Sequence, residues 1–313
     1  MPLVSVAIIT YNHEKYISET IESILMQRTN FQLEIVIGED CSTDNTSKIC
    51  LEYQKKYPDT IKLLSCNENR GFRQNTFNTF SNCKGEYIAF LEGDDFWTDE
   101  NKLQKQVDVL NDIAYQKYNL IAACCQTTVF FQNNISKNRN FSVFKDIHII
   151  DFEENIEKWQ FATCSFIFKN FFIDNSLSKL KDNFCKNKLF WSDRPLEVLL
   201  SMYGNFIYLP ENMCCFRRHG NNMTIIGNSA RHNEEGAFAY LHIAKLYPDK
   251  KEKIKELVLR WLLLAAEDHL KNKHFKHFFR CNFLAFMNIS SFLALKNYVK
   301  CNLFFLVNKK IYK

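Results

Sequence analysis

Glycine is scarce in this chain, with only 8 glycines among 313 residues. None of them forms a Gly-x-Gly-x-x-Gly or a Gly-x-x-x-x-Gly-Lys-[Ser/Thr] pattern, so the standard dinucleotide-binding and P-loop signatures are excluded. The 12 cysteines include no Cys-x-x-Cys pair, which excludes the common structural zinc motifs. Hydrophobic residues make up 46% and charged residues 24% of the chain, a balance that excludes an intrinsically disordered protein.

The sequence also has no long apolar run. A membrane-spanning helix needs roughly 20 consecutive apolar residues, and we therefore expect none here. The start of the chain has no basic region followed by a cleavage site of small residues, so we expect no signal peptide. Thiols in a chain without a secretion signal are typical of the reducing cytosol, and the sequence therefore predicts a cytoplasmic protein.

Positive charge is concentrated at the end of the chain. The net charge is +5, but residues 271–313 contain nine lysines and arginines and no acidic residue, so residues 1–270 carry −4 (+5 minus +9). Phenylalanines alternate with these cations, which predicts binding to an anionic membrane surface at the inner face of the cell membrane. A helical cap that packs its phenylalanines on the rest of the chain is the alternative. No nucleic-acid-binding motif accompanies the charge, so we expect no nucleic-acid partner.

Strand and helix patterns alternate over the first hundred residues. Short apolar runs predict four strands, over residues 4–10, 33–37, 61–64 and 86–91. Apolar residues at helical spacing predict helices after these strands, over residues 17–25, 44–57, 72–83 and from an N-cap at Thr98. This alternation predicts an α/β fold with a mostly parallel sheet that is covered by helices on both faces.

The rest of the chain predicts a different organisation. Residues 120–225 contain strand patterns separated by polar, asparagine-rich stretches, whereas residues 231–247 and 251–270 have helical patterns. We therefore predict two domains, an α/β domain over residues 1–225 and a helical extension with the basic, aromatic tail over residues 226–313.

Polar and acidic residues follow three of the predicted strands. They are residues 10–12 (Thr-Tyr-Asn), 38–40 (Gly-Glu-Asp) and 92–95 (Glu-Gly-Asp-Asp). The carboxyl ends of parallel strands lie at one edge of a sheet, where ligands bind. Several carboxylates at one edge repel each other unless a divalent cation lies between them and a phosphate, so we predict a Mg²⁺ or Mn²⁺ site and a phosphorylated substrate. For Asp44 and Asp99 we favour the alternative, in which an acid only caps a helix.

Three segments have the order and spacing of motifs in a known family. They are residues 4–12 (VSVAIITYN), 34–44 (EIVIGEDCSTD) and 85–95 (GEYIAFLEGDD). Together they resemble the family-2 inverting glycosyltransferases of GT-A fold. The resemblance is clear over residues 1–110 and looser to residue 225. It implies a GT-A type, mostly parallel nucleotide-binding sheet flanked by helices, followed here by a C-terminal helical extension.

The resemblance implies roles for several residues in binding the nucleotide-sugar. Thr10, Tyr11 and Asn12 would line the nucleotide pocket, with Tyr11 near a uracil ring. Asp40 would accept a hydrogen bond from the uracil N–H, which favours a UDP-sugar or a dTDP-sugar as donor. Arg73 would contact the diphosphate, with a solvated arginine at a helix start as the alternative.

The resemblance also implies a metal site. Asp94 would contact the ribose or the sugar, and Asp95 would bind Mn²⁺ or Mg²⁺. Residues 216–219 (Phe-Arg-Arg-His) resemble a motif near the end of the family's catalytic domain. In that motif Arg217 would close over the diphosphate and His219 would be a further metal ligand, with a structural or solvated histidine as the alternative.

Residues 190–194 (Phe-Trp-Ser-Asp-Arg) resemble the segment in which the family has its catalytic base. Inverting transfer needs a carboxylate that takes the proton from the acceptor hydroxyl, and Asp193 is our candidate. A role of Asp193 as a helix cap is the alternative. Trp191 would stack against a sugar ring on the acceptor side, with a position in the core as the alternative.

The function that the resemblance implies is metal-dependent, inverting transfer of a hexosyl or N-acetylhexosaminyl group. The donor would be a UDP-sugar or a dTDP-sugar, and the acceptor a hydroxyl of a glycan or lipid-linked molecule in bacterial surface polysaccharide assembly. A nucleotidyltransferase is one alternative, although residues 10–13 lack the basic or glycine-rich phosphate loop that it needs. A non-catalytic scaffold that binds sugar nucleotides or membranes is the other, and the acids at positions 40, 94, 95 and 193 argue against it.

Overall fold

The chain folds into two compact units, Met1–His219 and Gly220–Lys313. Each unit has its own cluster of buried apolar residues. The domain boundary that the sequence predicts after residue 225 falls among residues 220–228, which lie outside the described residues. The computed structural model describes residues 3–142, 144–157, 161–188, 192–219, 229–289 and 298–299.

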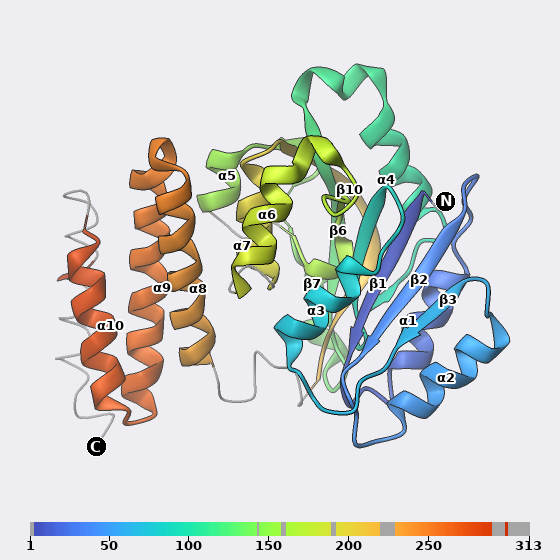
Figure 1. Ribbon diagram of the computed structural model, residues 1–313, viewed down its shortest axis with the longest axis horizontal. Helices are drawn as coiled ribbons and strands as arrows, with labels where there is room; N and C mark the ends of the chain where they lie inside the picture. The colour runs from blue at the N-terminus through green and yellow to red at the C-terminus, as the bar shows by residue number, and fades with distance from the viewer. Residues whose placement is uncertain are drawn as a thin grey trace. The chain divides into compact units, whose positions relative to one another are not determined.

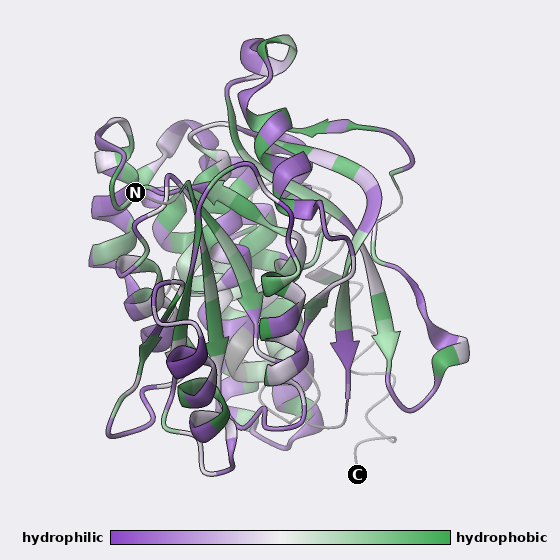
Figure 2. Ribbon diagram, turned by 90° about the vertical axis from the view of Figure 1, so that its right-hand side faces the viewer, coloured by the Kyte–Doolittle hydropathy of each residue, from purple (hydrophilic) through white to green (hydrophobic). Residues whose placement is uncertain are grey.

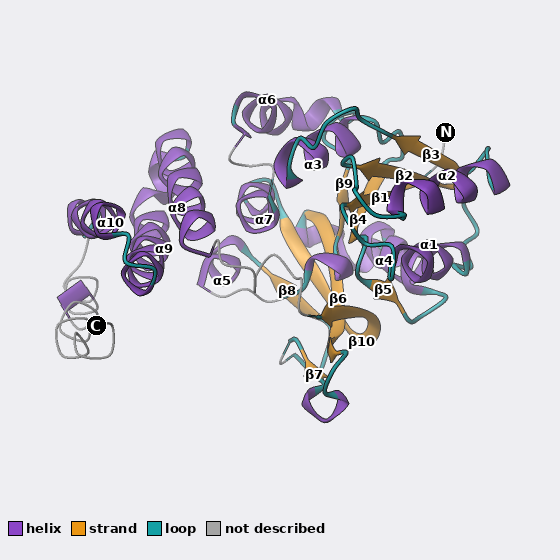
Figure 3. Cartoon of the chain, turned by 90° about the horizontal axis from the view of Figure 1, so that it is seen from below, coloured by secondary structure: helices purple, strands orange, loops and turns teal. Residues whose placement is uncertain are grey.

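The first half of the sheet in the N-terminal unit is parallel, as predicted. Its strands pair in the order β3-β2-β1-β4 (Figure 3). Figure 1 shows β1, β2 and β3 side by side. Every residue of the first strand is buried, and five of its seven residues are apolar, as expected for a strand covered on both faces. The four strands are β1 (Val4–Thr10), β2 (Leu33–Glu39), β3 (Ile61–Leu64) and β4 (Tyr87–Glu92).

Beyond β4 the sheet becomes mixed, and its order continues β4-β9-β6-β10-β5. β9 is antiparallel to both of its neighbours, whereas β6 and β10 are parallel to each other. Two further strands lie off this order: β7 pairs with β6 and β8 pairs with β10, both antiparallel. The six strands are β5 (Phe96–Trp97), β6 (Leu120–Phe131), β7 (Arg139–Asn140), β8 (His148–Ile150), β9 (Ile167–Lys169) and β10 (Asn205–Arg218).

Helices cover both faces of this sheet, as predicted. Helices α3 and α6 lie on one side of it and α1 and α4 on the other (Figure 3). Figure 2 shows that the central strands are largely hydrophobic, which is the pattern of a sheet enclosed between two layers of helices. The helices are α1 (Ile17–Leu25), α2 (Thr46–Lys56), α3 (Phe72–Ser81), α4 (Lys102–Asn111), α5 (Phe152–Glu157), α6 (Ser178–Lys186) and α7 (Asp193–Ser201).

Helix α4 begins later than the sequence predicts, and Thr98 is not its N-cap. The N–H of Thr98 donates to the carbonyl oxygen of Met213 at 2.9 Å, because Thr98 still follows the path of β5 beside β10. Asn101 is the residue that precedes the first helical residue, Lys102. The carboxylate of Asp99 accepts the N–H of Asn101 at 2.8 Å, as expected for an acid at a helix start.

A short antiparallel ladder joins the acidic segment after β4 to the far end of the sheet. β5 begins directly after Asp95, and its residues Phe96 and Trp97 pair with Cys215 and Cys214 of β10. The residues that follow on β10 therefore arrive beside the acidic segment. The register of this ladder determines which residues of β10 lie beside the acidic segment.

The C-terminal unit contains three described helices that follow one another through short connections. α9 packs against both α8 and α10 (Figure 1). None of the helices in the described part of the chain is both long and apolar enough to span a membrane. The helices are α8 (Ser229–Leu246), α9 (Lys251–Lys271) and α10 (Phe275–Met287).

Candidate active site

The carboxyl ends of β1, β2 and β4 meet at one edge of the sheet, as predicted; we call this the active edge. The N–H of Asp40 donates to the carbonyl oxygen of Thr10 at 3.1 Å, and the N–H of Gly93 donates to that of Ile9 at 2.9 Å. A Cβ atom at position 93 would lie 2.5 Å from Oγ1 of Thr10, so this close approach requires glycine. The segments after β2 and β4 are thus both fixed against the end of β1.

The three predicted nucleotide-binding residues at the end of β1 and directly after it differ in what their side chains contact. Asn12 has a left-handed backbone with φ of 56°, and its Oδ1 accepts the N–H of Thr43 at 2.8 Å. Thr10 is buried, and its Oγ1 lies 3.3 Å from Nδ1 of His13. Tyr11 is 41% exposed, so its ring is the one accessible to a nucleotide base. Nucleotide binding by these residues stays a prediction.

The carboxylate of Asp40 organises the loop before α3. Its Oδ1 accepts the N–H of Arg70 and its Oδ2 accepts the N–H of Gly71, both at 2.8 Å. Gly71 has a φ of 81°, a conformation that favours glycine. Oδ1 also accepts the thiol of Cys66 at 3.7 Å, whereas Oδ2 has a second lone pair that can accept a further donor. The contact with a uracil N–H stays a prediction. Arg73 lies in the first turn of α3 and is partly exposed, and its contact with a diphosphate also stays a prediction.

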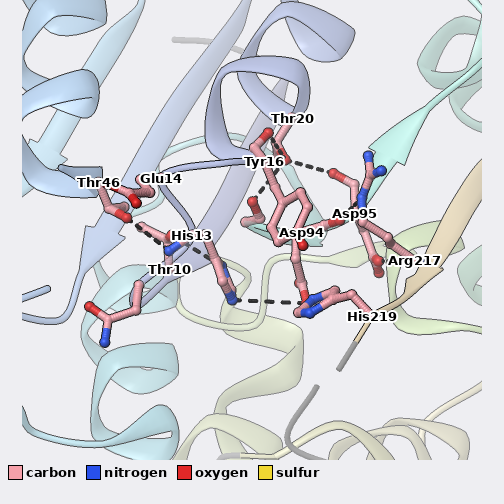
Figure 4. Close-up of polar contacts among 12 residues, drawn as sticks. Thr10, His13, Glu14, Tyr16, Thr20, Thr46, Asp94, Asp95, Arg217 and His219 are labelled. Carbon is pink, nitrogen blue, oxygen red and sulfur yellow. Dashed lines mark hydrogen bonds and ion pairs between the residues drawn. The ribbon is translucent and has the colours of Figure 1, made fainter. Parts of the chain in front are cut away.

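Asp94 lies between two histidines (Figure 4). Its Oδ2 accepts a hydrogen bond from Nε2 of His219 at 2.9 Å and lies 3.9 Å from Nε2 of His13. Burial raises the pKa of Asp94, but the hydrogen bond from His219 and the charge of His13 outweigh burial and lower it overall. Asp94 is therefore ionised at neutral pH. Burial lowers the pKa of His13, which favours its neutral form.

Asp95 is 1% exposed, and one of its carboxylate oxygens has no hydrogen-bond partner among the described residues. Oδ1 accepts the N–H of Arg217 at 2.8 Å, whereas Oδ2 is the unpartnered atom. Burial, followed by the charges of Asp94 and Glu92, raises the pKa of Asp95 well above its usual range. The pKa of Glu92 is also raised, by burial and by the charges of Asp94 and Asp193.

This arrangement fits a hard divalent cation. The active edge brings Glu92, Asp94 and Asp95 together and contains a buried oxygen that has no partner among the described residues. A bound cation would favour the ionised forms of these acids and would give that oxygen a partner. Mg²⁺ and Mn²⁺ prefer oxygen ligands and often use one or two carboxylates together with substrate phosphates. Asp95 and Asp94 would supply the oxygens, and the ring of His219 already lies against Asp94.

Arg217 contacts both Asp94 and Asp95 through hydrogen bonds. Its Nε donates to the carbonyl oxygen of Asp94 at 2.9 Å, its N–H donates to Asp95, and its guanidinium pairs with Glu19 on α1 at 2.5 Å. These contacts hold the segment of Asp94 and Asp95 in place. The predicted contact of Arg217 with a diphosphate stays a prediction. Three aromatic rings have centroids within 5.6 Å of its guanidinium carbon, those of Tyr16, Phe96 and Phe130.

Asp193 opens helix α7 and is partly exposed. Its Oδ1 accepts the N–H of Arg194 at 2.7 Å, while Ser192 takes the N-cap position. The charge of Asp193 contributes to the raised pKa of Glu92, so its carboxylate lies near the acids of the active edge. Its role as catalytic base stays a prediction. Trp191 lies outside the described residues.

Three side chains contribute to the active edge without appearing among the predicted site residues: His13, Tyr16 and Glu19. His13 directly follows the predicted nucleotide-binding residues, and this adjacency is the signal that could have identified it. Tyr16 packs on the ring of His219 with a centroid distance of 4.7 Å. Glu19 pairs with a residue 198 positions away, and no local sequence pattern indicates such a partner.

The fold defines the class of protein, which is an α/β protein of GT-A type with an acidic carboxyl edge. Residues 5–178 match the profile of glycosyl transferase family 2. This match covers more than half of the chain, so the chain belongs to that family.

A curated relative comes from Bacillus subtilis strain 168. It is the glycosyltransferase TuaG, whose name places it in teichuronic acid biosynthesis. TuaG is 34% identical to this chain over 125 residues, which are 39% of this chain and 48% of TuaG. The chain spans about a third of the length of the first curated relatives it matches, with 31% covered.

Solved structures show the same fold. TarS of S. aureus, residues 1–349 in complex with UDP-GlcNAc, has a TM-score of 0.62 at 16% identity, over 92% of this chain and 81% of that chain. The mannosyltransferase PcManGT from Pyrobaculum calidifontis, in complex with GDP-Man and Mn²⁺, has a TM-score of 0.55 at 17% identity, over 97% of this chain and 81% of that chain. At these identities the likeness establishes the GT-A type fold alone.

Proposed function

We propose that this chain catalyses metal-dependent, inverting transfer of a hexosyl or N-acetylhexosaminyl group from a UDP-sugar to a hydroxyl. The acceptor would be a glycan or lipid-linked molecule in bacterial surface polysaccharide assembly. The observation that carries the proposal is the unpartnered Oδ2 of buried Asp95, next to ionised Asp94 at the carboxyl edge of a family-2 chain. The role that TuaG's name gives it supports the place in polysaccharide assembly.

The residues of this chain would hold the metal and the donor diphosphate together. Asp95, Asp94 and His219 would bind Mn²⁺ or Mg²⁺, and Arg217 would keep the two aspartates in place. When bound, the ion supplies charge stabilisation for the departing nucleoside diphosphate. The Mn²⁺ in the PcManGT complex supports this choice of ion.

Asp193 would take the proton from the acceptor hydroxyl as that oxygen attacks the anomeric carbon. Its position at the start of α7 leaves its carboxylate partly exposed, as a group that must reach an acceptor requires. A positioned general base contributes about 10²–10⁴-fold to such a reaction.

The donor base would lie between Tyr11 and Asp40. The exposed ring of Tyr11 offers a stacking surface, and Oδ2 of Asp40 retains a lone pair that can accept a uracil or thymine N–H. Both bases carry that N–H, so a dTDP-sugar is the alternative donor. The UDP-GlcNAc complex of TarS supports a UDP-sugar.

The C-terminal unit would bind the inner face of the cell membrane, which gives the protein a cytoplasmic, peripheral location. On α10 a row of large apolar side chains is more than half exposed, next to basic residues. Flotation with anionic liposomes tests this role, and we expect the double variant Phe279→Ser/Phe283→Ser to bind less. Equal binding of the variant would contradict it. The row comprises Phe275, Phe279, Phe283, Phe286 and Met287.

The first experiment is calorimetric titration with UDP, GDP and CDP, with and without Mn²⁺. We expect Mn²⁺-dependent binding with preference for UDP, followed by UDP release from a UDP-sugar when an acceptor is present. Binding of none of the three nucleotides would favour the scaffold alternative. Preference for another base would remove Asp40 from its proposed role.

A further inference from the structure

A second group of metal-binding side-chain types lies in the C-terminal unit; we call it the three-helix cluster. Glu234 on α8, His269 in the last turn of α9 and Cys281 on α10 each offer a ligand atom within 4.8 Å of the other two. All three residues are buried. Within the described residues, this is the one group of three or more histidine, cysteine or acidic side chains with such spacing.

His277 adds a second nitrogen to the three-helix cluster. It precedes Cys281 by four residues, so both side chains lie on the same face of α10. Its Nδ1 lies 3.8 Å from Oε2 of Glu234, and its ring centroid lies 4.9 Å from that of His269. Half of its side chain is exposed, which places it on the solvent side of the cluster.

His269 is the side chain whose environment points to a ligand. It is 5% exposed, and neither of its ring nitrogens has a hydrogen-bond partner among the described residues. The nearest carboxylate oxygen is Oε2 of Glu234, 3.6 Å from Nε2. Burial lowers the pKa of His269, so its ring is neutral and has a lone pair for a metal.

A recess of about 630 Å³ gives access to these groups. Glu234, His269 and His277 line it, together with His274 and Arg280. A metal ion can therefore enter the cluster from solvent without unfolding the helices.

We propose that the three-helix cluster binds one Zn²⁺ ion. Nitrogen, sulfur and carboxylate oxygen are the ligands that Zn²⁺ uses in tetrahedral sites, whereas Mg²⁺ and Mn²⁺ favour oxygen. The ion would join α8, α9 and α10, so its role would be structural. The proposal does not rest on glycosyl transfer, because the cluster lies within the C-terminal unit. The four ligands would be Glu234, His269, His277 and Cys281.

The charges around the cluster are compatible with a bound cation. Arg280 donates to Oε1 of Glu234, which leaves Oε2 facing the two histidines. Burial raises the pKa of Glu234, but Arg280 outweighs it, so the carboxylate is ionised. Burial and then Glu234 raise the pKa of Cys281 to about 12. Zinc binding would therefore replace the thiol proton of Cys281, which passes to solvent as the zinc–sulfur bond forms.

The test uses the full chain, stripped with a chelator and titrated with Co²⁺ as a coloured substitute for Zn²⁺. We expect a thiolate-to-cobalt absorption band that saturates at one equivalent and is lost when one equivalent of Zn²⁺ is added. Cys281→Ser should lose the band, and His269→Gln should weaken Co²⁺ binding at least about tenfold. The matched controls Cys185→Ser and His242→Gln, both outside the cluster, should keep both properties. Asp95→Asn should also keep them, which separates this site from the active edge.

Absence of the band in the unaltered chain, or its persistence in Cys281→Ser, would overturn the proposal. If Cys281→Ser does not fold, the unaltered chain still provides a test. Zinc should slow alkylation of Cys281 at least about tenfold, as measured by mass spectrometry of the labelled peptide. An unchanged rate of labelling there would overturn the proposal as well.

Discussion

The active edge and the three-helix cluster are assembled in opposite ways. At the active edge two adjacent aspartates follow one strand, and the histidine that contacts Asp94 comes from 125 residues further along. In the three-helix cluster every residue comes from α8, α9 or α10, and two of them are one turn apart on the same helix. The first needs the whole sheet to form, whereas the second needs only a helical unit.

The two regions also differ in charge and in ligand type. The active edge collects carboxylates and leaves a buried oxygen of Asp95 without a partner. The three-helix cluster has one carboxylate, already paired with Arg280, and adds nitrogen and sulfur. The comparison teaches that one chain can present a hard site and a softer site, which should select different ions.

The largest effect should follow from removing the buried carboxyl group of Asp95 at the active edge. Asp95→Asn keeps the acceptor oxygen for the N–H of Arg217 but loses the proposed anionic metal ligand. We expect glycosyl transfer to fall at least about 10⁴-fold, because metal stabilisation of the leaving group provides several kcal/mol. Transfer rates at saturating Mn²⁺ measure this. Asp99→Asn, in the same segment but at the start of α4, is the control, and an equal loss there would contradict a specific role of Asp95.

The next effect concerns Asp193. Asp193→Asn removes the proposed base but keeps an oxygen for the N–H of Arg194. We expect transfer to fall about 10³-fold while the affinity for UDP and Mn²⁺ stays the same, because a base acts only in the chemical step. Parallel calorimetry and turnover measurements check this separation. Unchanged turnover would eliminate Asp193 as the base.

A smaller effect should follow from a change at Arg217, which contacts both aspartates. Arg217→Lys cannot keep both the contact with the Asp94 carbonyl oxygen and the pair with Glu19. We expect about a 10–100-fold weakening of Mn²⁺ activation, as for other residues that orient metal ligands. The Mn²⁺ dependence of the rate measures it, and Arg218→Lys is the neighbouring control. If only the affinity for UDP-sugar fell, Arg217 would act on the diphosphate instead.

The smallest effect concerns the stability of the Asp95→Asn variant. This substitution should stabilise the fold, although it should impair glycosyl transfer. The raised pKa of Asp95 means that the folded, metal-free protein holds a proton that the unfolded chain releases, so its contribution to stability falls as pH rises above the usual carboxyl range. The Asp95→Asn variant has no carboxyl group at this position, so its stability does not fall with rising pH for this reason. We expect it to stabilise the chelator-treated protein by about 1–3 kcal/mol near neutral pH and by less at about pH 5.5. Thermal unfolding at both pH values measures it, and a larger gain at the lower pH would contradict the raised pKa.

Much of the fold follows from local sequence patterns. β1 and β3 begin and end where the short apolar runs predict, and β1, the more central of the two, is buried throughout. The start of α4 could not be predicted in the same way. The backbone of Thr98 bonds to Met213, more than a hundred residues away, and this pairing delays the helix. The antiparallel insertion of β9 beside β4 is likewise a long-range event.

The candidate site shows the same division. The acids at the ends of β2 and β4 could be predicted, because strand polarity alone brings them to one edge. The pair between Glu19 and Arg217 could not, since it depends on how β10 crosses the sheet. The unpartnered oxygen of Asp95 is also invisible in sequence, because it results from what surrounds the carboxylate and not from its neighbours in the chain.

The ladder between β5 and β10 limits how the chain length can change. Successive residues of a strand point to opposite faces, so one residue inserted between Cys215 and Arg217 would turn the arginine away from Asp94 and Asp95. An insertion between Asn134 and Lys137, in the turn after β6, would leave that ladder in register. Length variation in related chains should therefore concentrate in such turns, and a gap in the last part of β10 should mark a chain without the proposed metal site.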